Sequence, residues 1–154
     1  MVVCGYHPVH RELEKAFALA LGVDDALLFS SGYTANLGVI ALLAHFQGDL
    51  LIDKAAHASF YDGLKLTKAK YSRFLHNDLD SLATKLQQIT SNPVVITESV
   101  FSMSGQITCL AELAHLCARY KAELIVDEAH AFGVLGPQGL GAVAQHELSQ
   151  KKYL

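Results

Sequence analysis

Charge of either sign is scarce in this sequence. Its 154 residues include 12 Lys and Arg against 15 Asp and Glu, which gives a net charge of −3. No basic run occurs, so the sequence gives no reason to expect a nucleic-acid partner. Apolar residues make up 51% of the chain, which excludes a disordered protein, and the length corresponds to about one domain. The mean hydropathy of +0.26 indicates a buried parallel sheet, a large oligomer interface, or both.

Cysteine is also scarce, and its spacing excludes two common scaffolds. Cys4, Cys109 and Cys117 are odd in number and form no C-x-x-C pair, so neither a disulfide framework nor a zinc ribbon is predicted. We expect buried, reduced thiols, which fit a reducing compartment. The first residues lack the features of a signal peptide, and the longest apolar stretch, 39–46, is too short to span a bilayer. Together these features predict a cytoplasmic protein.

Glycine and proline divide the chain into alternating helical and extended segments. The helical spacing of apolar residues and the flanking cap residues predict helices over 9–21, 33–46, 57–68, 78–89 and 110–120. Short apolar runs predict strands over 26–29, 49–53, 94–97 and 123–127, and the segment 71–75 is also expected to be a strand. A loop rich in glycine, over 133–141, follows the last of these strands. This alternation predicts an α/β fold, with a mostly parallel sheet and helices on both faces.

Polar side chains gather directly after four of the predicted strands, at the edge where parallel sheets bind their ligands. They occupy the segments 30–36, 53–57, 98–105 and 127–130. The first segment opens a helix, where free backbone N–H groups and the helix dipole favour a phosphate. An ordinary capped turn is the simpler explanation of this segment taken alone, since glycines between a strand and a helix are common.

Three kinds of site can be built from these polar segments. A metal site would use His57, Asp127 and His130, but no fixed ligand spacing such as H-E-x-x-H supports it. A Ser-His-Asp hydrolase would use Ser102 as its nucleophile, but Ser102 does not lie in a G-x-S-x-G motif. A phosphate-bearing cofactor with a nitrogen ring would place its phosphate at the first segment and its ring nitrogen at Asp127. This third site alone uses all four polar segments.

Six ordered blocks of the sequence resemble those of the α-oxoamine synthases, which are pyridoxal-phosphate enzymes of the fold-type I aminotransferase class. The blocks are GYHPVHRELE (5–14), FSSGYTAN (29–36), HAS (57–59), HND (76–78), TESVFSM (97–103) and VDEAH (126–130). The ordered set is specific, although each block alone is not. The resemblance implies that residues 1–154 form part of the major, cofactor-binding domain of such an enzyme. The strand that carries the imine-forming lysine and the small domain would be absent from it.

The resemblance assigns the phosphate of pyridoxal 5'-phosphate to the first polar segment. Gly32 and Tyr33 would give backbone N–H groups to this phosphate, and Asn36 would support the loop.

The other three segments would surround the ring of the cofactor. The resemblance implies that His57 stacks on the pyridine ring, and that Asp127 pairs with the protonated ring nitrogen and keeps the ring an electron sink. His130 would hydrogen-bond the phenolic oxygen, and Ser102 would lie near that oxygen or the imine. Glu98 would be a neighbouring active-site carboxylate.

The implied reaction is a decarboxylative condensation of an amino acid with an acyl-CoA thioester, which yields an α-amino ketone. No metal is expected to take part. Because the family's lysine lies downstream of the glycine loop, we expect this chain alone to lack normal catalysis. It would then be the cofactor-binding part of an enzyme that acts as a homodimer or with a complementary chain, or a non-catalytic folded or dimerising module.

Overall fold

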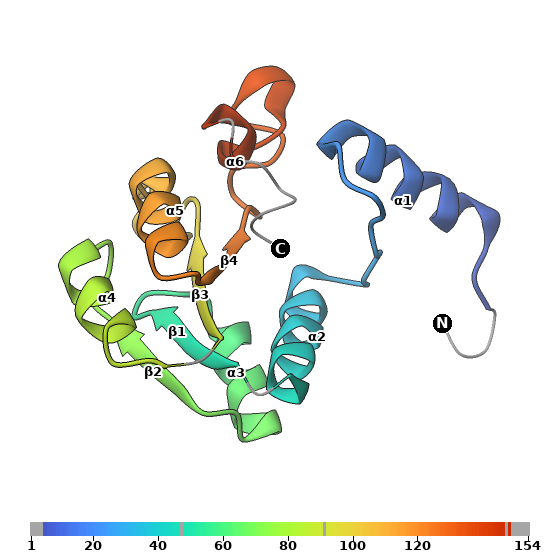
Figure 1. Cartoon of the computed structure of the whole chain (residues 1–154). Coiled ribbons are helices and arrows are strands. Elements are labelled where there is room, and N and C mark those ends of the chain that lie inside the picture. The colour runs from blue at the N-terminus through green and yellow to red at the C-terminus, as the bar shows by residue number, and fades with distance from the viewer. Residues whose placement is uncertain (1–4, 47, 91, 147, 149–154) are drawn as a thin grey trace.

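The fold is a single parallel sheet with helices on both faces (Figure 1). The computed structural model describes residues 5–46, 48–90, 92–146 and 148. The strands lie in the order β2-β1-β3-β4 and are β1 Asp49–Asp53, β2 Tyr71–Phe74, β3 Pro93–Glu98 and β4 Glu123–Asp127. The helices are α1 Pro8–Leu21, α2 Gly32–His45, α3 Ala58–Thr67, α4 Leu79–Leu86, α5 Leu110–Arg119, the short 3-10 helix η1 Pro137–Gly139 and α6 Ala142–Gln145. This architecture confirms the predicted α/β fold.

The two faces of the sheet each bury an apolar layer, because alternate residues of a strand point to opposite faces. Leu51, Val95 and Leu124 pack in one cluster with residues of α4 and α5. Leu50 and Ile96 belong to the other cluster, with residues of α2 and α3. All six residues of β3 are buried, as expected for a central strand covered on both faces. Such strands account for part of the high mean hydropathy.

Local capping signals position the helix ends and the strand ends. Gly22 ends α1 in the left-handed conformation, with φ of 67°, which glycine adopts at little cost. The carboxylate of Asp78 accepts a hydrogen bond from the Ser81 amide at 2.7 Å and so caps α4. Asp53, at the end of β1, is one of three carboxylates that terminate neighbouring strands; Glu98 and Asp127 are the others.

The predicted strand over 26–29 is wrong. This segment pairs with none of the strands in the described part of the chain. The amide of Leu28 donates instead to the carboxylate of Glu14 in α1, at 2.9 Å. The Phe29 ring lies against Gly38 of α2. An apolar run is therefore not sufficient for a strand, because a strand also needs a neighbour that completes its backbone hydrogen bonds.

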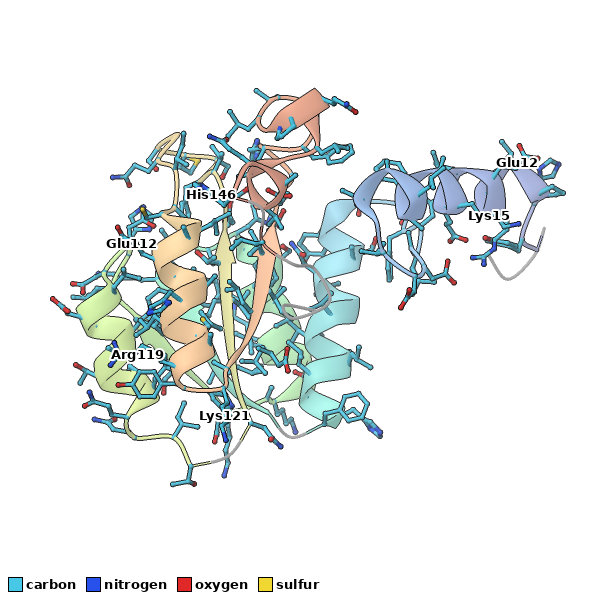
Figure 2. The ribbon with its side chains drawn as sticks, turned by 45° about the horizontal axis from the view of Figure 1, so that its top comes forward. Glu12, Lys15, Glu112, Arg119, Lys121 and His146 are labelled. Atoms are coloured by element: carbon cyan, nitrogen blue, oxygen red, sulfur yellow. The ribbon has the colours of Figure 1, made fainter. Side chains whose placement is uncertain are left out.

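Helix α1 extends away from the sheet, and a segment over 22–31 joins it to α2 (Figure 1). Figure 2 shows Lys15 on this helix, remote from the strands. The rings of Phe17 and Phe132, with centroids 5.4 Å apart, connect α1 to the loop that follows β4. Large apolar side chains on and beside α1 stay exposed, among them Leu19 and Leu27. The apolar cores of the sheet therefore form the frame of the molecule, and α1 projects from it.

The glycine-rich loop after β4 contains η1 and leads into α6, and the sequence predicted neither helix. The carboxylate of Glu128 accepts hydrogen bonds from the amides of Ala142 at 2.6 Å and Val143 at 3.0 Å, where α6 begins. A Cβ atom at Gly141 would lie 2.3 Å from that carboxylate. Glycine is therefore required at this position for the capping carboxylate to approach the backbone.

The expectation of buried thiols is confirmed at one cysteine. Cys117, in α5, is buried in the core, and burial raises the pKa of its thiol to about 12. Cys109 is exposed, so the expectation is wrong there, and Cys4 lies outside the described residues. Among the helices that the structure describes, none has the length and apolar content needed to cross a bilayer.

The contact between α2 and α3 leads to a stability prediction. A Cβ at Gly63 of α3 would lie 2.9 Å from the Cβ of Ile40, which is fully buried in α2. Overpacking costs about 1–3 kcal/mol, and alanine regains about 1 kcal/mol over glycine inside a helix, so we expect Gly63→Ala to lower the free energy of unfolding by up to about 2 kcal/mol. The measurement is urea unfolding followed by circular dichroism.

Gly38→Ala in α2 is the matched control for this substitution. Its added Cβ would meet the ring of Phe29 at 3.2 Å, but that side chain is 43% exposed and free to shift. Alanine is favoured over glycine inside a helix by about 1 kcal/mol, so this variant should be as stable as the native chain or more stable. Equal destabilisation by both substitutions would contradict the tight crossing at Gly63.

Candidate active site

Helix α2 begins with two backbone amides that are free to bind an anion. The hydroxyl of Ser31 accepts a hydrogen bond from the Thr34 amide at 3.2 Å, and the Ser31 carbonyl accepts one from the Ala35 amide at 3.0 Å. Within the described ranges, the amides of Gly32 and Tyr33 have no protein acceptor. A Cβ at Gly32 would meet no atom within 4 Å, so the backbone is open there. The helix dipole adds to the attraction for a negative group.

A chain of side-chain hydrogen bonds joins Asn36, one turn into α2, to the end of β4. The Nδ2 atom of Asn36 donates to Oδ2 of Asp127 at 2.9 Å and to the Ser59 hydroxyl at 3.0 Å. That hydroxyl lies 2.8 Å from Nδ1 of His57, the N-cap residue of α3. The Ala129 amide donates to the other oxygen of Asp127 at 2.9 Å. Three of the predicted site residues are thereby linked by one network.

Glu98, the last residue of β3, is a buried carboxylate with one unpaired oxygen. Its exposed fraction is 3%, and its Oε1 atom has no hydrogen-bond partner among the residues that the structure describes. Burial raises the pKa of this carboxyl above its ordinary value, and the charge of Asp127 acts in the same direction. The backbone amides of His57 and Ser102 oppose that rise in pKa. Glu98 therefore lies close to other predicted site residues, in surroundings that favour its neutral form.

Two predicted residues stay outside the network. The side chains of Ser102 and His130 are exposed, and in the segments that the structure describes neither has a side-chain hydrogen-bond partner. The hydrolase hypothesis gains no support, because no hydrogen bond joins Ser102 to His57 or His130 across these segments. The metal hypothesis gains none either, since among the described residues no three His, Cys, Asp or Glu side chains gather as a metal site.

The side chain of Tyr33 has a structural contact of its own. Its hydroxyl donates to Oδ2 of Asp62 at 2.9 Å and so ties the start of α2 to α3. This hydrogen bond raises the pKa of Tyr33 and lowers the pKa of Asp62. The contact leaves the backbone amide of Tyr33 free, so it does not compete with the predicted role of that amide.

Sequence reasoning gave no role to Ser59 or Asp53. Ser59 is fully buried and connects Asn36 to His57, and its only signal was its place in the HAS block. Asp53 is 1% exposed and accepts hydrogen bonds from the Ala55 and Asn77 amides, at 2.8 and 3.2 Å. A third contact, at 3.0 Å, joins it to Nδ1 of His76. These partners occupy both oxygens of Asp53, which makes it an organiser of loops.

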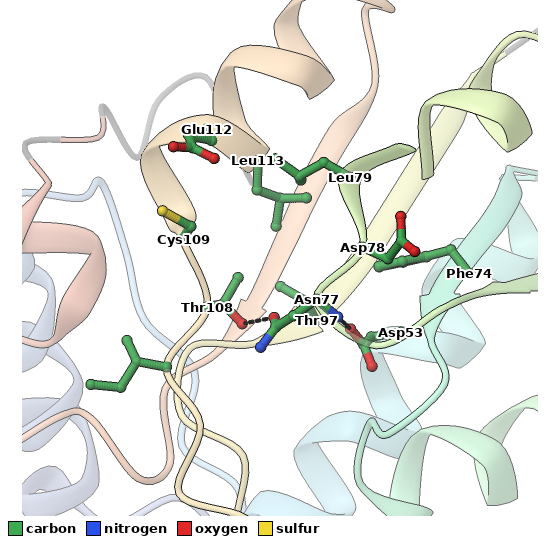
Figure 3. Close-up of a pocket in the computed structure, with 11 residues that line it drawn as sticks. Asp53, Phe74, Asn77, Asp78, Leu79, Thr97, Thr108, Cys109, Glu112 and Leu113 are labelled. Atoms are coloured by element: carbon green, nitrogen blue, oxygen red, sulfur yellow. Dashed lines mark hydrogen bonds between the residues drawn. The ribbon is translucent and has the colours of Figure 1, made fainter. Parts of the chain in front are cut away.

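A separate cavity of about 140 Å³ lies beside Asp53, between the loops that follow β2 and β3 (Figure 3). Asn77, Thr108 and Glu112 are among its lining residues. The Thr108 hydroxyl donates to Oδ1 of Asn77 at 3.1 Å, and the Asn77 amide donates to Asp53. None of the predicted site residues lines this cavity, so it is distinct from the candidate site.

The residues at the candidate site fit a phosphate-bearing cofactor with a nitrogen ring. Asn36 follows Gly32 by four positions, so the free amides and the Asp127 network lie on the same side of α2, one turn apart. The amides suit a phosphate, and a carboxylate held by two donors suits a protonated ring nitrogen. The donors at one end and the acceptor at the other match the charges of such a cofactor.

Comparison with known proteins places these features in a family. The model for aminotransferase class I and II matches residues 3–154. The 8-amino-7-oxononanoate synthase of Marinobacter nauticus is 43% identical over 150 residues, which are 97% of this chain and 38% of that protein.

Two solved structures extend the likeness to the fold. A serine palmitoyltransferase variant from S. paucimobilis, solved with bound PLP and myriocin, matches with a TM-score of 0.88 at 35% identity. The match covers 98% of this chain and 38% of that one. The 8-amino-7-oxononanoate synthase of Francisella tularensis matches with a TM-score of 0.80 at 38% identity, over 96% of this chain and 42% of that one. The chain thus spans 38–42% of the length of these relatives.

The unpaired carboxylate of Glu98 leads to a prediction about pH. Its pKa is higher in the folded chain than in the unfolded chain, so the folded state binds this proton more tightly. The contribution of Glu98 to stability is therefore lost as pH rises from the unfolded pKa, about 4.3, through the folded pKa. We expect the stability of Glu98→Gln relative to the native chain to increase from pH 4 to pH 8.

Urea unfolding of both proteins at several pH values within this range measures the effect. Glu123→Gln, at the exposed start of β4, removes the same formal charge and shows what net charge alone contributes. A Glu98→Gln difference that stays constant or decreases with pH would contradict a raised pKa of Glu98.

Proposed function

The chain belongs to the aminotransferase class I and II family, and on this premise we propose that it is the cofactor-binding part of an α-oxoamine synthase. The observation that carries the proposal is the pair of free amides at the start of α2, one turn from the network that holds Asp127. The likeness to 8-amino-7-oxononanoate synthases and to a serine palmitoyltransferase solved with PLP supports it.

We assign the phosphate of pyridoxal 5'-phosphate to the amides of Gly32 and Tyr33. Asn36 would stabilise this end by holding the first turn of α2 against Asp127. An anion there would accept from two N–H groups that have no acceptor in the described part of the chain, and it would also interact with the helix dipole.

We assign the ring of the cofactor to Asp127 and His57. The carboxylate of Asp127 would face the protonated ring nitrogen, and the imidazole of His57 would stack on the ring. Ser102 and His130, which are exposed near this edge of the sheet, would approach the phenolic oxygen, and Glu98 would lie behind them as a buried carboxylate. When bound, pyridoxal phosphate supplies the electron sink that allows an amino acid to lose its α-proton.

The proposed reaction joins an amino acid to the acyl group of an acyl-CoA, with loss of carbon dioxide and release of CoA. We favour L-alanine and pimeloyl-CoA, the substrates of 8-amino-7-oxononanoate synthase in biotin biosynthesis, because the relatives compared by sequence carry that name. Serine palmitoyltransferase, 2-amino-3-ketobutyrate CoA ligase and 5-aminolevulinate synthase are the alternatives. The serine palmitoyltransferase fold, with its TM-score of 0.88, is the observation that keeps them open.

We also propose that the chain functions in the cytoplasm as a homodimer or with a complementary chain. Apolar side chains on α1 and its connection support a partner, since Val9, Leu13, Leu19 and Leu27 are 42–85% exposed. The second candidate function, a non-catalytic module that folds or dimerises, rests on the same exposed surface. Binding of pyridoxal phosphate separates the two functions, because the module needs no cofactor.

The amide of Gly32 can be removed without breaking α2. Proline is favoured at the first position of a helix, and the preceding Ser31 is extended, with φ −162° and ψ 160°, as a residue before proline prefers. We expect Gly32→Pro to weaken pyridoxal-phosphate binding about 10- to 100-fold, the loss of one hydrogen bond to a charged group. The measurement is a titration followed by absorbance and induced circular dichroism.

Gly32→Ala is the matched control, because alanine adds a Cβ as proline does but keeps the amide. Only the difference between the two variants is attributed to the N–H group. Pyridoxal, which lacks the phosphate, should bind all three proteins alike. If proline and alanine weaken pyridoxal-phosphate binding equally, the phosphate does not lie at this amide.

A further experiment tests whether residues 1–154 catalyse the reaction. We expect a saturable dichroic band with pyridoxal phosphate, no lysine adduct after borohydride reduction, and no release of CoA from pimeloyl-CoA in the presence of L-alanine. The reason is that the family's lysine belongs to a strand downstream of the glycine loop. A borohydride-fixed lysine adduct, mapped by mass spectrometry, together with CoA release, would show that the chain is active as it stands.

A further inference from the structure

The protonation of His57 follows from the atoms that surround its Nδ1. The Ser59 amide donates to this nitrogen at 3.2 Å, and the Ser59 hydroxyl lies 2.8 Å from it. A backbone N–H has no lone pair to offer, so Nδ1 must be the acceptor. A neutral imidazole that accepts at Nδ1 carries its proton on Nε2.

The direction of the remaining hydrogen bonds follows from the same count of protons. Because Nδ1 of His57 accepts, the single hydroxyl proton of Ser59 points to it, and the Ser59 oxygen accepts from Asn36 at 3.0 Å. The second proton of the Asn36 amide donates to Asp127 at 2.9 Å. Both amide protons of Asn36 are then used, and its orientation is fixed because a carboxylate can only accept.

We propose that Asn36 and Ser59 are positioning residues that hold His57 as the Nε2–H tautomer and tie its ring to Asp127. The placement of His57 and Asp127 around a cofactor rests on the proposed function, whereas the order of donors and acceptors does not. Ser59 is fully buried, so water does not compete for its hydroxyl. These hydrogen bonds form a relay from His57 through Ser59 and Asn36 to Asp127. The relay anchors one edge of the imidazole and leaves the face of the ring available for stacking. It also sets the angle between His57 and Asp127.

The test uses the chain without cofactor, labelled with ¹⁵N in its histidines. Two-bond ¹H–¹⁵N correlation spectra at pH 8.5, about two units above the ordinary histidine pKa, distinguish a protonated from an accepting ring nitrogen. His57→Gln identifies the signals of His57. We expect Nε2 to be protonated and Nδ1 to show the shift of a hydrogen-bonded acceptor. In Ser59→Ala the Nδ1 shift should move toward that of a free acceptor, and in Ser59→Thr it should be retained.

Two controls distinguish the relay from a general effect on the fold. Ser72→Ala, on the exposed strand β2, should leave the His57 signals unchanged. The signals of His76, which is paired with Asp53 at 3.0 Å, should be the same in Ser59→Ala as in the native chain. A proton on Nδ1 of native His57, or an Nδ1 shift unaffected by Ser59→Ala, would overturn the proposal. If Ser59→Ala does not fold, Asn36→Ala is the substitute, with a smaller Nδ1 change in the same direction.

Binding of pyridoxal phosphate supplies the second readout. Ser59→Ala and Asn36→Ala should each raise the Kd about two- to tenfold, the usual net effect of one hydrogen bond. Because both residues belong to one relay, the double variant should bind no more weakly than the weaker single variant. Effects that multiply would overturn the relay even where both residues matter. If the native chain fails to bind pyridoxal phosphate, the proposed function fails while the spectra still decide the tautomer.

Discussion

One hydrogen bond, from Asn36 to Asp127, holds together parts of the chain that are 91 residues apart. Asn36 lies one turn into α2, and Asp127 lies at the end of β4, an outer strand of the four-stranded sheet. Apolar packing brings α2 onto the sheet, but burial is non-directional and would accept several rotations of the helix. A 2.9 Å hydrogen bond to a carboxylate is compatible with far fewer rotations of the helix. The relation between the open start of α2 and the end of β4 depends on this contact.

Three carboxylates end neighbouring strands. Their surroundings indicate which of them stabilises the fold and which could bind a ligand. Both oxygens of Asp53 are already hydrogen-bonded, to two amides and His76, so its charge is stabilised without a ligand. Asp127 is held by Asn36 and Ala129 but stays partly exposed. Glu98 is buried with one oxygen unpaired, which costs stability unless the group is neutral or another group approaches it. An arrangement that costs stability at Glu98 is expected at a functional site rather than in a core.

Much of the fold could be predicted from the sequence because each core strand is a short apolar run between polar residues. The run over 26–29 has the same composition, yet the amide of Leu28 bonds to Glu14 of α1, and composition does not encode that choice. Strand ends located the polar segments, but the pairing of Asn36 with Asp127 depends on how α2 crosses the sheet. Ser59 was overlooked because a hydroxyl two residues after a helix cap is a common local feature. The roles of Ser102 and His130 come from the family resemblance, and no contact of theirs tests those roles.

The start of α2 also relates the free amides to the residue that binds Asp127. Gly32 and Asn36 are four positions apart, which corresponds to a rise of about 6 Å along a helix. Under the proposed function, the phosphate would lie at the free amides where this turn begins. The ring nitrogen would face Asp127, which is bound by Asn36 where the turn ends. The Ser31 cap holds the near end of that turn, and the Asp127 contact holds the far end. Neither end can shift without breaking a hydrogen bond, so under the proposed function the phosphate end and the ring end of the cofactor would both be held in place.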